Sequence, residues 1–186
     1  MNNIINAKDS LNTVNSASGI VRALFTGFMF ISAYVIIVIA STDDMQLLRF
    51  SPIKLPLLDT EINLKGFYTW MPWLYIIIHA HLLLLVTFLD NKLTHFKNIL
   101  RTIDSSERTH LREQLHVLSI TQYLSGRHTG LLGISISTLF WVSLVFLPIL
   151  LLLAMQIDFL PAQEIEIVWN QRFSILIDTL FIFLWG

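Results

Sequence analysis

The chain has 186 residues, of which 54% are hydrophobic and 13% charged, about half the usual charged share of ~25%. Its formal net charge of −1 provides no concentrated basic surface, which argues against nucleic acid as a partner. The lack of cysteine excludes disulfides, thiolate metal sites, iron–sulfur clusters and cysteine nucleophiles. The length allows one compact domain, which we expect to be a transmembrane domain over residues 19–186 after a polar lead, 1–18.

Four long apolar stretches separated by charged loops predict an all-α integral membrane protein, a four-span helical bundle. A helix needs about 20 apolar residues to cross the hydrocarbon core. The predicted spans are residues 20–41, 66–90, 130–156 and 172–186. The last apolar stretch begins at Phe173 and leaves only 14 residues, about 21 Å of helix. We therefore expect the fourth span to be incomplete.

The loop after the first span alternates apolar with polar or proline residues. Ile53, Leu55 and Leu57 follow this pattern, and Ile62 and Leu64 resume it after a polar tip. Alternation with period two around such a tip predicts a β-hairpin. We expect a small extracytoplasmic hairpin that packs over the outer mouth of the bundle.

The second span opens with an aromatic cluster, which is typical of the membrane interface; the alternative is an aromatic ligand cage. The cluster comprises Phe67, Tyr68, Trp70, Trp73 and Tyr75. We expect Pro72 to lie within the first turns of this helix, where a missing N–H has the smallest effect. In the third span, Pro148 predicts a kink unless neighbouring groups satisfy the freed carbonyl.

Residues 91–125 predict a cytoplasmic amphipathic helical segment between the second and third spans. Its first part extends the second helix, and Asp104 with Glu107 has the spacing of a capping box that begins a new helix. Such a segment can lie on anionic lipid headgroups or pack against a partner protein, and both readings stay open. The basic residues expected to make these contacts are Lys92, Lys97, Arg101, Arg108 and Arg112.

The distribution of lysine and arginine over the loops predicts the orientation. The loop between the second and third spans is basic, whereas the loop between the third and fourth is acidic apart from Arg172. The N-terminal lead adds Lys8 and Arg22. We therefore expect the N-terminus, the basic segment and the C-terminus to be cytoplasmic.

Four polar residues of the predicted spans are the candidate site residues: Asp178, His79, His81 and Arg172. Asp178 lies inside the fourth span, where an isolated carboxylate costs about 2.5–3.5 kcal/mol on insertion scales, so it should bond a neighbouring helix or line an ion or proton path. Arg172 lies about 240° around the helix from it and cannot share its face. His79 and His81 lie near the middle of the second span but point to different sides. We expect one of these histidines to form a hydrogen bond across the bundle, to Asp178, a serine or a backbone carbonyl; a His79–Asp178 contact would be a reasonable buried polar link.

Motifs of soluble enzymes are absent from the sequence: it has no GxGxxG, Walker loop, HExxH or GxSxG. The remaining histidines lack a metal-ligand spacing, and a bis-histidine haem would need imidazoles that the other spans do not provide. We expect no catalytic residues, no metal site and no cofactor.

Ordered polar markers resemble those of the N-terminal membrane region of bacterial pentapeptide-repeat inner-membrane proteins. These markers are Ile53-Lys54-Leu55-Pro56-Leu57-Leu58-Asp59, Gly66-Phe67-Tyr68, Phe159-Leu160-Pro161, Trp169, Arg172 and Asp178. The chain departs from the family pattern at Asn170-Gln171, where a histidine commonly precedes the arginine, so no His–Arg site is carried over. The resemblance implies a multi-pass protein of the bacterial inner membrane that acts as an anchor or assembly module.

From these features we expect a membrane-anchoring and interaction module, and no enzyme. It would present the basic cytoplasmic segment, or a region beyond residue 186, to partners. The expected partners are the lipid bilayer and either further copies of the chain or another protein. The alternative is an oligomeric ion-conducting or pore-forming effector, for example of a bacterial defence or toxin system, with Asp178 and His79 along the path.

Overall fold

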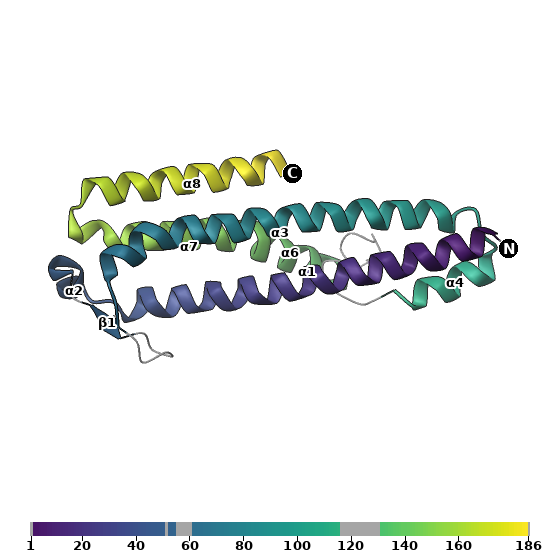
Figure 1. Cartoon of the computed structure of the whole chain (residues 1–186), viewed down its shortest axis with the longest axis horizontal. Helices are drawn as coiled ribbons and strands as arrows, with labels where there is room; N and C mark the ends of the chain where they lie inside the picture. The colour runs from purple at the N-terminus through teal and green to yellow at the C-terminus, as the bar shows by residue number, and fades with distance from the viewer. Residues whose placement is uncertain (1, 51, 55–60, 116–130, 186) are drawn as a thin grey trace. The chain divides into compact units, whose positions relative to one another are not determined.

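The computed structural model describes residues 2–50, 52–54, 61–115 and 131–185. The helices that enter the four spans are α1 (Asn2–Ser41), α3 (Leu64–Leu100), α6 (Leu131–Trp141), α7 (Leu147–Phe159) and α8 (Ile165–Trp185) (Figure 1). The shorter elements are α2 (Asp44–Arg49), β1 (Ile53–Lys54), β2 (Glu61–Ile62), α4 (Ser105–Glu113), a π-helical turn (Val142–Phe146) and a 3₁₀ turn (Leu160–Ala162).

Four of the described helical segments are long and apolar enough to cross a membrane. They are Ile4–Ser41, Leu64–Leu100, Ser137–Ala162 and Ile165–Trp185. This confirms the prediction of a multi-pass helical protein with four candidate spans.

The prediction of an incomplete fourth span is wrong, because α8 begins at Ile165 and not near Phe173. Its 21 residues extend over about 32 Å, enough to cross the hydrocarbon core. The apolar stretch from Phe173 is shorter than α8 because polar residues occupy the first turns of this helix. Asn170 and Gln171 remain helical there, since both side chains donate hydrogen bonds to backbone carbonyls of α3.

The predicted extension of the second helix is present, since α3 runs past residue 90 to Leu100. The polar lead is also helical from Asn2 and continuous with the first span, which the sequence pattern did not predict. Helix α4 begins directly after Asp104, as the capping-box pattern predicted, and the Arg108 N–H donates to the Asp104 carbonyl over 3.0 Å. The rest of the predicted cytoplasmic segment, 116–125, lies outside the described residues.

The first loop contains a minimal antiparallel pairing. Ile53 lies opposite Ile62 and Lys54 lies opposite Glu61. Residues 55–60, which would form the rest of the expected hairpin, lie outside the described residues. A two-residue ladder alone does not establish a hairpin that packs over the bundle, so that expectation stays a prediction.

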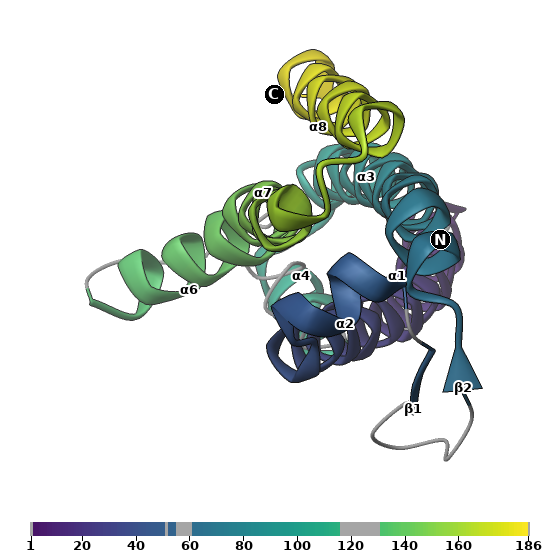
Figure 2. The ribbon, with the colours of Figure 1, turned by 90° about the vertical axis from the view of Figure 1, so that its left-hand side faces the viewer.

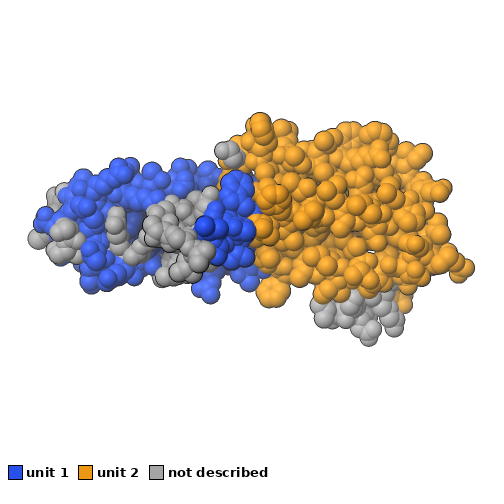
Figure 3. All heavy atoms as spheres, turned by 180° about the vertical axis from the view of Figure 1, so that it is seen from behind, with its two compact units in different colours: residues 1–26, 82–141 blue, residues 27–81, 142–186 orange. Residues whose placement is uncertain are grey.

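The chain divides into two compact units, each containing parts of α1 and α3 (Figure 3). Unit 1 comprises residues 1–26 and 82–141, and unit 2 comprises residues 27–81 and 142–186. In unit 1 one row of buried residues on each helix recurs at alternating intervals of four and three. The rows are Ala7, Leu11, Val14, Ser18 and Val21 on α1, and Leu82, Val86, Leu89, Leu93, Phe96 and Leu100 on α3; Leu83 is buried beside the second row. Such a seam is the packing pattern of antiparallel helix pairs.

Unit 2 contains the first half of α3 together with α7, α8 and the second half of α1 (Figure 2). Its core includes the fully buried rings of Phe28, Tyr68, Tyr75 and Phe159. Phe28 packs on Tyr75 with 5.0 Å between ring centroids, and Tyr68 packs on Phe159 with 4.9 Å. Among these rings lies the polar cluster that forms the candidate site.

Candidate functional site: a buried histidine–aspartate pair

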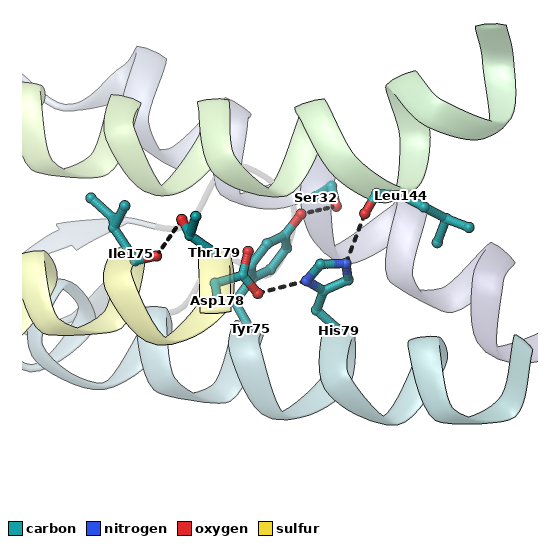
Figure 4. A network of polar contacts seen from close by, with 7 residues as sticks. All are labelled: Ser32, Tyr75, His79, Leu144, Ile175, Asp178 and Thr179. Atoms are coloured by element: carbon teal, nitrogen blue, oxygen red, sulfur yellow. Dashed lines mark hydrogen bonds and ion pairs between the residues drawn. The ribbon is translucent and has the colours of Figure 1, made fainter. Parts of the chain in front are cut away.

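The centre of unit 2 is a hydrogen-bonded pair between His79 on α3 and Asp178 on α8. The two side chains are 0% and 1% exposed. Nδ1 of His79 lies 2.6 Å from Oδ1 of Asp178, and Nε2 lies 2.9 Å from the carbonyl oxygen of Leu144 (Figure 4). The His79 ring also stacks on Phe28 with 5.5 Å between centroids. The histidine therefore joins α3 to α8 and to the π-helical turn.

Pro148 lies four residues after Leu144 and cannot donate to the carbonyl that accepts this bond. In an α-helix the carbonyl of residue i accepts from the N–H of residue i+4, and proline has no N–H. The π-helical turn Val142–Phe146 ends just before this proline. His79 thus supplies the donor that Pro148 lacks. A neighbouring helix is one of the sources from which carbonyls freed by proline in a span obtain a donor.

The contacts of His79 fix the position of its hydrogens. A carbonyl oxygen can only accept, so Nε2 carries a hydrogen and donates it to Leu144. The 2.6 Å separation of Nδ1 from Asp178 Oδ1 also requires a hydrogen between them, because two lone pairs would repel at that distance. The pair therefore contains one shared proton and is neutral overall, either as imidazolium with carboxylate or as imidazole with carboxylic acid.

Tyr75 and Ser32 form a second polar link beside this pair, between α3 and α1. Ser32 Oγ donates to the Phe28 carbonyl over 2.8 Å, and it lies 2.9 Å from the Tyr75 hydroxyl. Since the serine hydrogen is already donated, the tyrosine must be the donor to Ser32. Figure 4 shows this link next to the His79–Asp178 contact.

Gln171 repeats the arrangement at a second proline. The prediction that Pro72 lies in the first turns of its helix is wrong, because α3 begins at Leu64 and contains Pro72 in its interior. The carbonyl freed by Pro72 belongs to Tyr68, four residues earlier. The Gln171 Nε2 group donates to it over 3.3 Å. A buried side chain of α8 thus compensates for a proline of α3.

Further links join the same helices around Gln171. Asn170 donates to the Thr69 carbonyl over 2.9 Å and accepts from Trp73 Nε1 over 2.7 Å. The Tyr68 hydroxyl donates to Asp158. Two members of the predicted aromatic interface, Tyr68 and Tyr75, are fully buried and form hydrogen bonds in the interior of unit 2. Trp70, in contrast, is 72% exposed.

The other intramembrane candidates lie outside this cluster. His81 is exposed, as expected from its position two residues after His79. Arg172 is also exposed, and its guanidinium lies 5.0 Å from the centre of the Trp169 ring. The structure therefore brings together His79 and Asp178, the contact that the sequence favoured, and leaves His81 and Arg172 apart from them.

The basic residues of the predicted cytoplasmic segment differ in their surroundings. Lys92 and Arg101 are exposed, Lys97 is half-buried, and the side chain of Arg112 lies outside the description. Arg108 is half-buried and donates to the Ile103 carbonyl over 2.8 Å. It therefore stabilises the turn after α3, a role that differs from the expected contact with headgroups or a partner.

Sequence reasoning assigned no site role to Gln171 or Asp158, and it did not name a donor for the carbonyl freed by Pro148. The sequence did contain a signal for the Leu144 carbonyl and for a partner of the Tyr68 carbonyl, because each interior proline identifies one unpaired carbonyl four residues before it. A polar residue on another span is then the candidate donor. Among the described residues, no group of three or more His, Asp or Glu side chains could hold a metal ion.

Comparison with known proteins found no matching family model, no matching curated protein and no matching solved structure.

Proposed function

We propose that the chain is a membrane-anchoring and interaction module of a bacterial inner-membrane assembly. Four candidate spans supply the anchor. The basic end of α3 and the following α4 would present charged side chains to a protein partner or a second copy of the chain. In the proposed orientation the N-terminus and α4 are cytoplasmic, and the loop containing β1 and β2 is a hairpin on the opposite side.

The observation that carries this proposal is the use of buried polar groups in unit 2 as links between helices. Hydrogen bonds join Ser32 of α1 to Tyr75 of α3 and His79 of α3 to Asp178 of α8. Gln171 of α8 donates a hydrogen bond to a backbone carbonyl of α3. Packing and hydrogen bonds are what hold helices together in lipid, where the hydrophobic effect between them is lost. Such links suit a rigid anchor, and the resemblance to pentapeptide-repeat membrane proteins points to the same role.

A second candidate function is proton or ion conduction by an oligomer. It is favoured by one observation: His79 and Asp178 form a buried ionisable pair near the middle of a span, and such residues often belong to ion or proton pathways. Under this proposal the shared proton would be passed between protomers.

Asp178→Asn separates the two candidates. For the anchor, we expect the variant to insert and to form the same cross-linked complexes in membranes as the unchanged chain. For the conductor, the variant would abolish a proton flux that the unchanged chain produces in pH-gradient liposomes. A flat trace for the unchanged chain would exclude conduction.

The interaction part of the proposal has its own test. Reversing two basic charges with Arg101→Glu and Arg112→Glu should remove discrete cross-linked complexes while leaving membrane insertion intact. Neutralising the exposed Arg172 with Arg172→Gln is the matched control, since this residue lies in unit 2. Complexes that survive both charge reversals would count against α3 and α4 as the interaction surface.

A further inference from the structure

A polar groove in unit 1 lies between the start of α1 and the second half of α3. Its volume is about 890 Å³, within the size range of small-molecule sites. Helix α1 contributes Asp9 to it, and α3 contributes Phe88, Lys92 and His95. The three α3 residues follow one another at spacings of four and three, which places them along one face of the helix.

The groove crosses from the apolar part of α3 to its polar part. Phe88 belongs to the uncharged stretch that ends at Leu89, whereas Lys92 and His95 follow it. The lining of the groove on α3 and the turn after it runs from Phe88 to Thr102, about 21 Å along the helix axis at 1.5 Å per residue. This length exceeds the headgroup layer on one side of a bilayer, about 5–8 Å. In a membrane-inserted chain, the Phe88 end of the groove would lie at the boundary between acyl chains and headgroups, and Lys92 and His95 would follow it within about 10 Å.

The charged groups of the groove have opposite signs and come from different helices. Asp9 lies on α1, and Lys92 and His95 lie on α3. Within the described part of the chain, the side chains of these three residues form no ion pair with one another or with other residues. The groove thus offers both an acidic and a basic wall to a ligand.

This arrangement selects among ligand charges. A purely anionic headgroup would be attracted by Lys92 but repelled by Asp9. A headgroup with a phosphate and a primary ammonium satisfies both walls, because the ammonium can donate hydrogen bonds to a carboxylate. A choline headgroup has the same charges, but its quaternary nitrogen has no N–H to donate.

We propose that this groove binds a phosphoethanolamine headgroup, with the phosphate at Lys92 and His95 and the primary ammonium at Asp9. We assign this headgroup to a membrane lipid, since Phe88 extends the site toward the acyl chains. This inference rests on the membrane location in the proposed function, but not on the anchoring role.

The test uses the full chain in nanodiscs, with the bound lipid counted by native mass spectrometry. Nanodiscs contain phosphatidylcholine mixed with equal parts of either phosphatidylethanolamine or phosphatidylglycerol. We expect phosphatidylethanolamine to be enriched over phosphatidylcholine by about 1.4-fold to fivefold, the range of one exposed charge pair. Asp9→Asn should remove that preference, and Lys92→Gln should lower retention of both zwitterionic lipids by a similar factor.

Matched controls neutralise exposed charges of the same unit that do not line the groove. Lys8→Gln and Glu113→Gln should leave lipid retention unchanged. Soluble phosphoethanolamine is the arm that identifies the source of the ligand. If it competes as well as the lipid does, the site takes the free compound and the lipid assignment is wrong.

Two other results would overturn the proposal. Equal retention of both zwitterionic lipids, or enrichment of phosphatidylglycerol that Asp9→Asn does not alter, would show that the groove does not recognise a primary ammonium. Vesicle flotation separates this failure from that of the proposed function. A chain that floats with vesicles but shows no headgroup preference refutes only the groove, whereas a chain that does not float refutes both.

Discussion

Replacing His79 should destabilise unit 2 far more than replacing Asp178 with its neutral isostere. His79→Phe keeps an aromatic ring that can stack on Phe28 but removes two hydrogen bonds. The Leu144 carbonyl then has neither a backbone donor, because of Pro148, nor the imidazole. Asp178 also remains buried without its partner.

The magnitude follows from these two unpaired groups. A buried polar group left without a hydrogen bond costs about 1–3 kcal/mol. Removing one member of a buried charged pair costs about 3–5 kcal/mol, although a carboxyl group that takes up a proton avoids part of this. Measured links between membrane helices average only ~0.6 kcal/mol, because unpaired groups find other partners in the membrane. We therefore expect His79→Phe to lower the free energy of unfolding by about 2–4 kcal/mol.

Asp178→Asn should lower the free energy of unfolding by less than about 1 kcal/mol. With Nε2–H still donated to Leu144, a neutral His79 presents a lone pair at Nδ1. The side-chain amide introduced by this substitution can donate to that lone pair. The contact thus survives without the shared proton, and the Leu144 carbonyl keeps its donor.

The measurement is reversible unfolding in bicelles or mixed micelles, by denaturant titration or by steric trapping. Labelling histidine with ¹⁵N gives a second readout. Nε2 should be protonated in both proteins, while Nδ1 should change from a shared-proton signal to that of a bare acceptor in Asp178→Asn. Equal destabilisation by the two substitutions, or a neutral His79 protonated at Nδ1 only, would refute the assigned hydrogen positions.

Three further predictions use the same unfolding assay. Adding Pro148→Ala to His79→Phe should recover about 1 kcal/mol, because the restored N–H can serve the freed carbonyl; no recovery would mean that the proline is not what leaves it unpaired. Gln171→Leu should cost about 1–2 kcal/mol by exposing the second freed carbonyl, and a neutral effect would show that water or relaxation replaces the amide. Tyr75→Phe should cost no more than about 1 kcal/mol, since Ser32 keeps its own donated bond, and a larger loss would indicate that the tyrosine is the donor for another group.

The sequence predicted the membrane class and the central contact for physical reasons that act locally. Apolar stretches of sufficient length reveal spans, and an aspartate inside one of them requires a polar partner. His79 was the candidate with the right depth. The extent of α8 was missed because the boundary was placed at Arg172, whereas the polar turn before it is stabilised by contacts with α3.

The other half of the site depends on tertiary geometry that no local pattern encodes. Nothing around Gln171 indicates that it reaches the Tyr68 carbonyl, because that contact joins residues 103 positions apart. The π-helical turn before Pro148 was likewise not predicted, since the apolar residues of Val142–Phe146 are compatible with an ordinary helix. Interior prolines identify the acceptors, but the fold selects the donors.

The two proline-dependent bonds have a consequence for the assembly of the protein in the membrane. His79 and Asp178 lie 99 residues apart, so α3 is synthesised long before α8. In the two-stage view, spans insert individually and associate afterwards. Until α8 arrives, the imidazole of α3 has no carboxyl partner and the Tyr68 carbonyl has no amide donor.

Each freed carbonyl also has a fixed height along its helix, so its donor must arrive at the same depth. A displacement of α8 by one turn, about 5.4 Å, would break both the His79–Asp178 and the Gln171–Tyr68 contacts at once. The Gln171–Tyr68 bond at Pro72 and the His79–Asp178 pair therefore favour one vertical position of α8 over a position shifted by one turn. When α8 associates with α3, this vertical position is set and the last buried polar groups of unit 2 gain their hydrogen-bond partners.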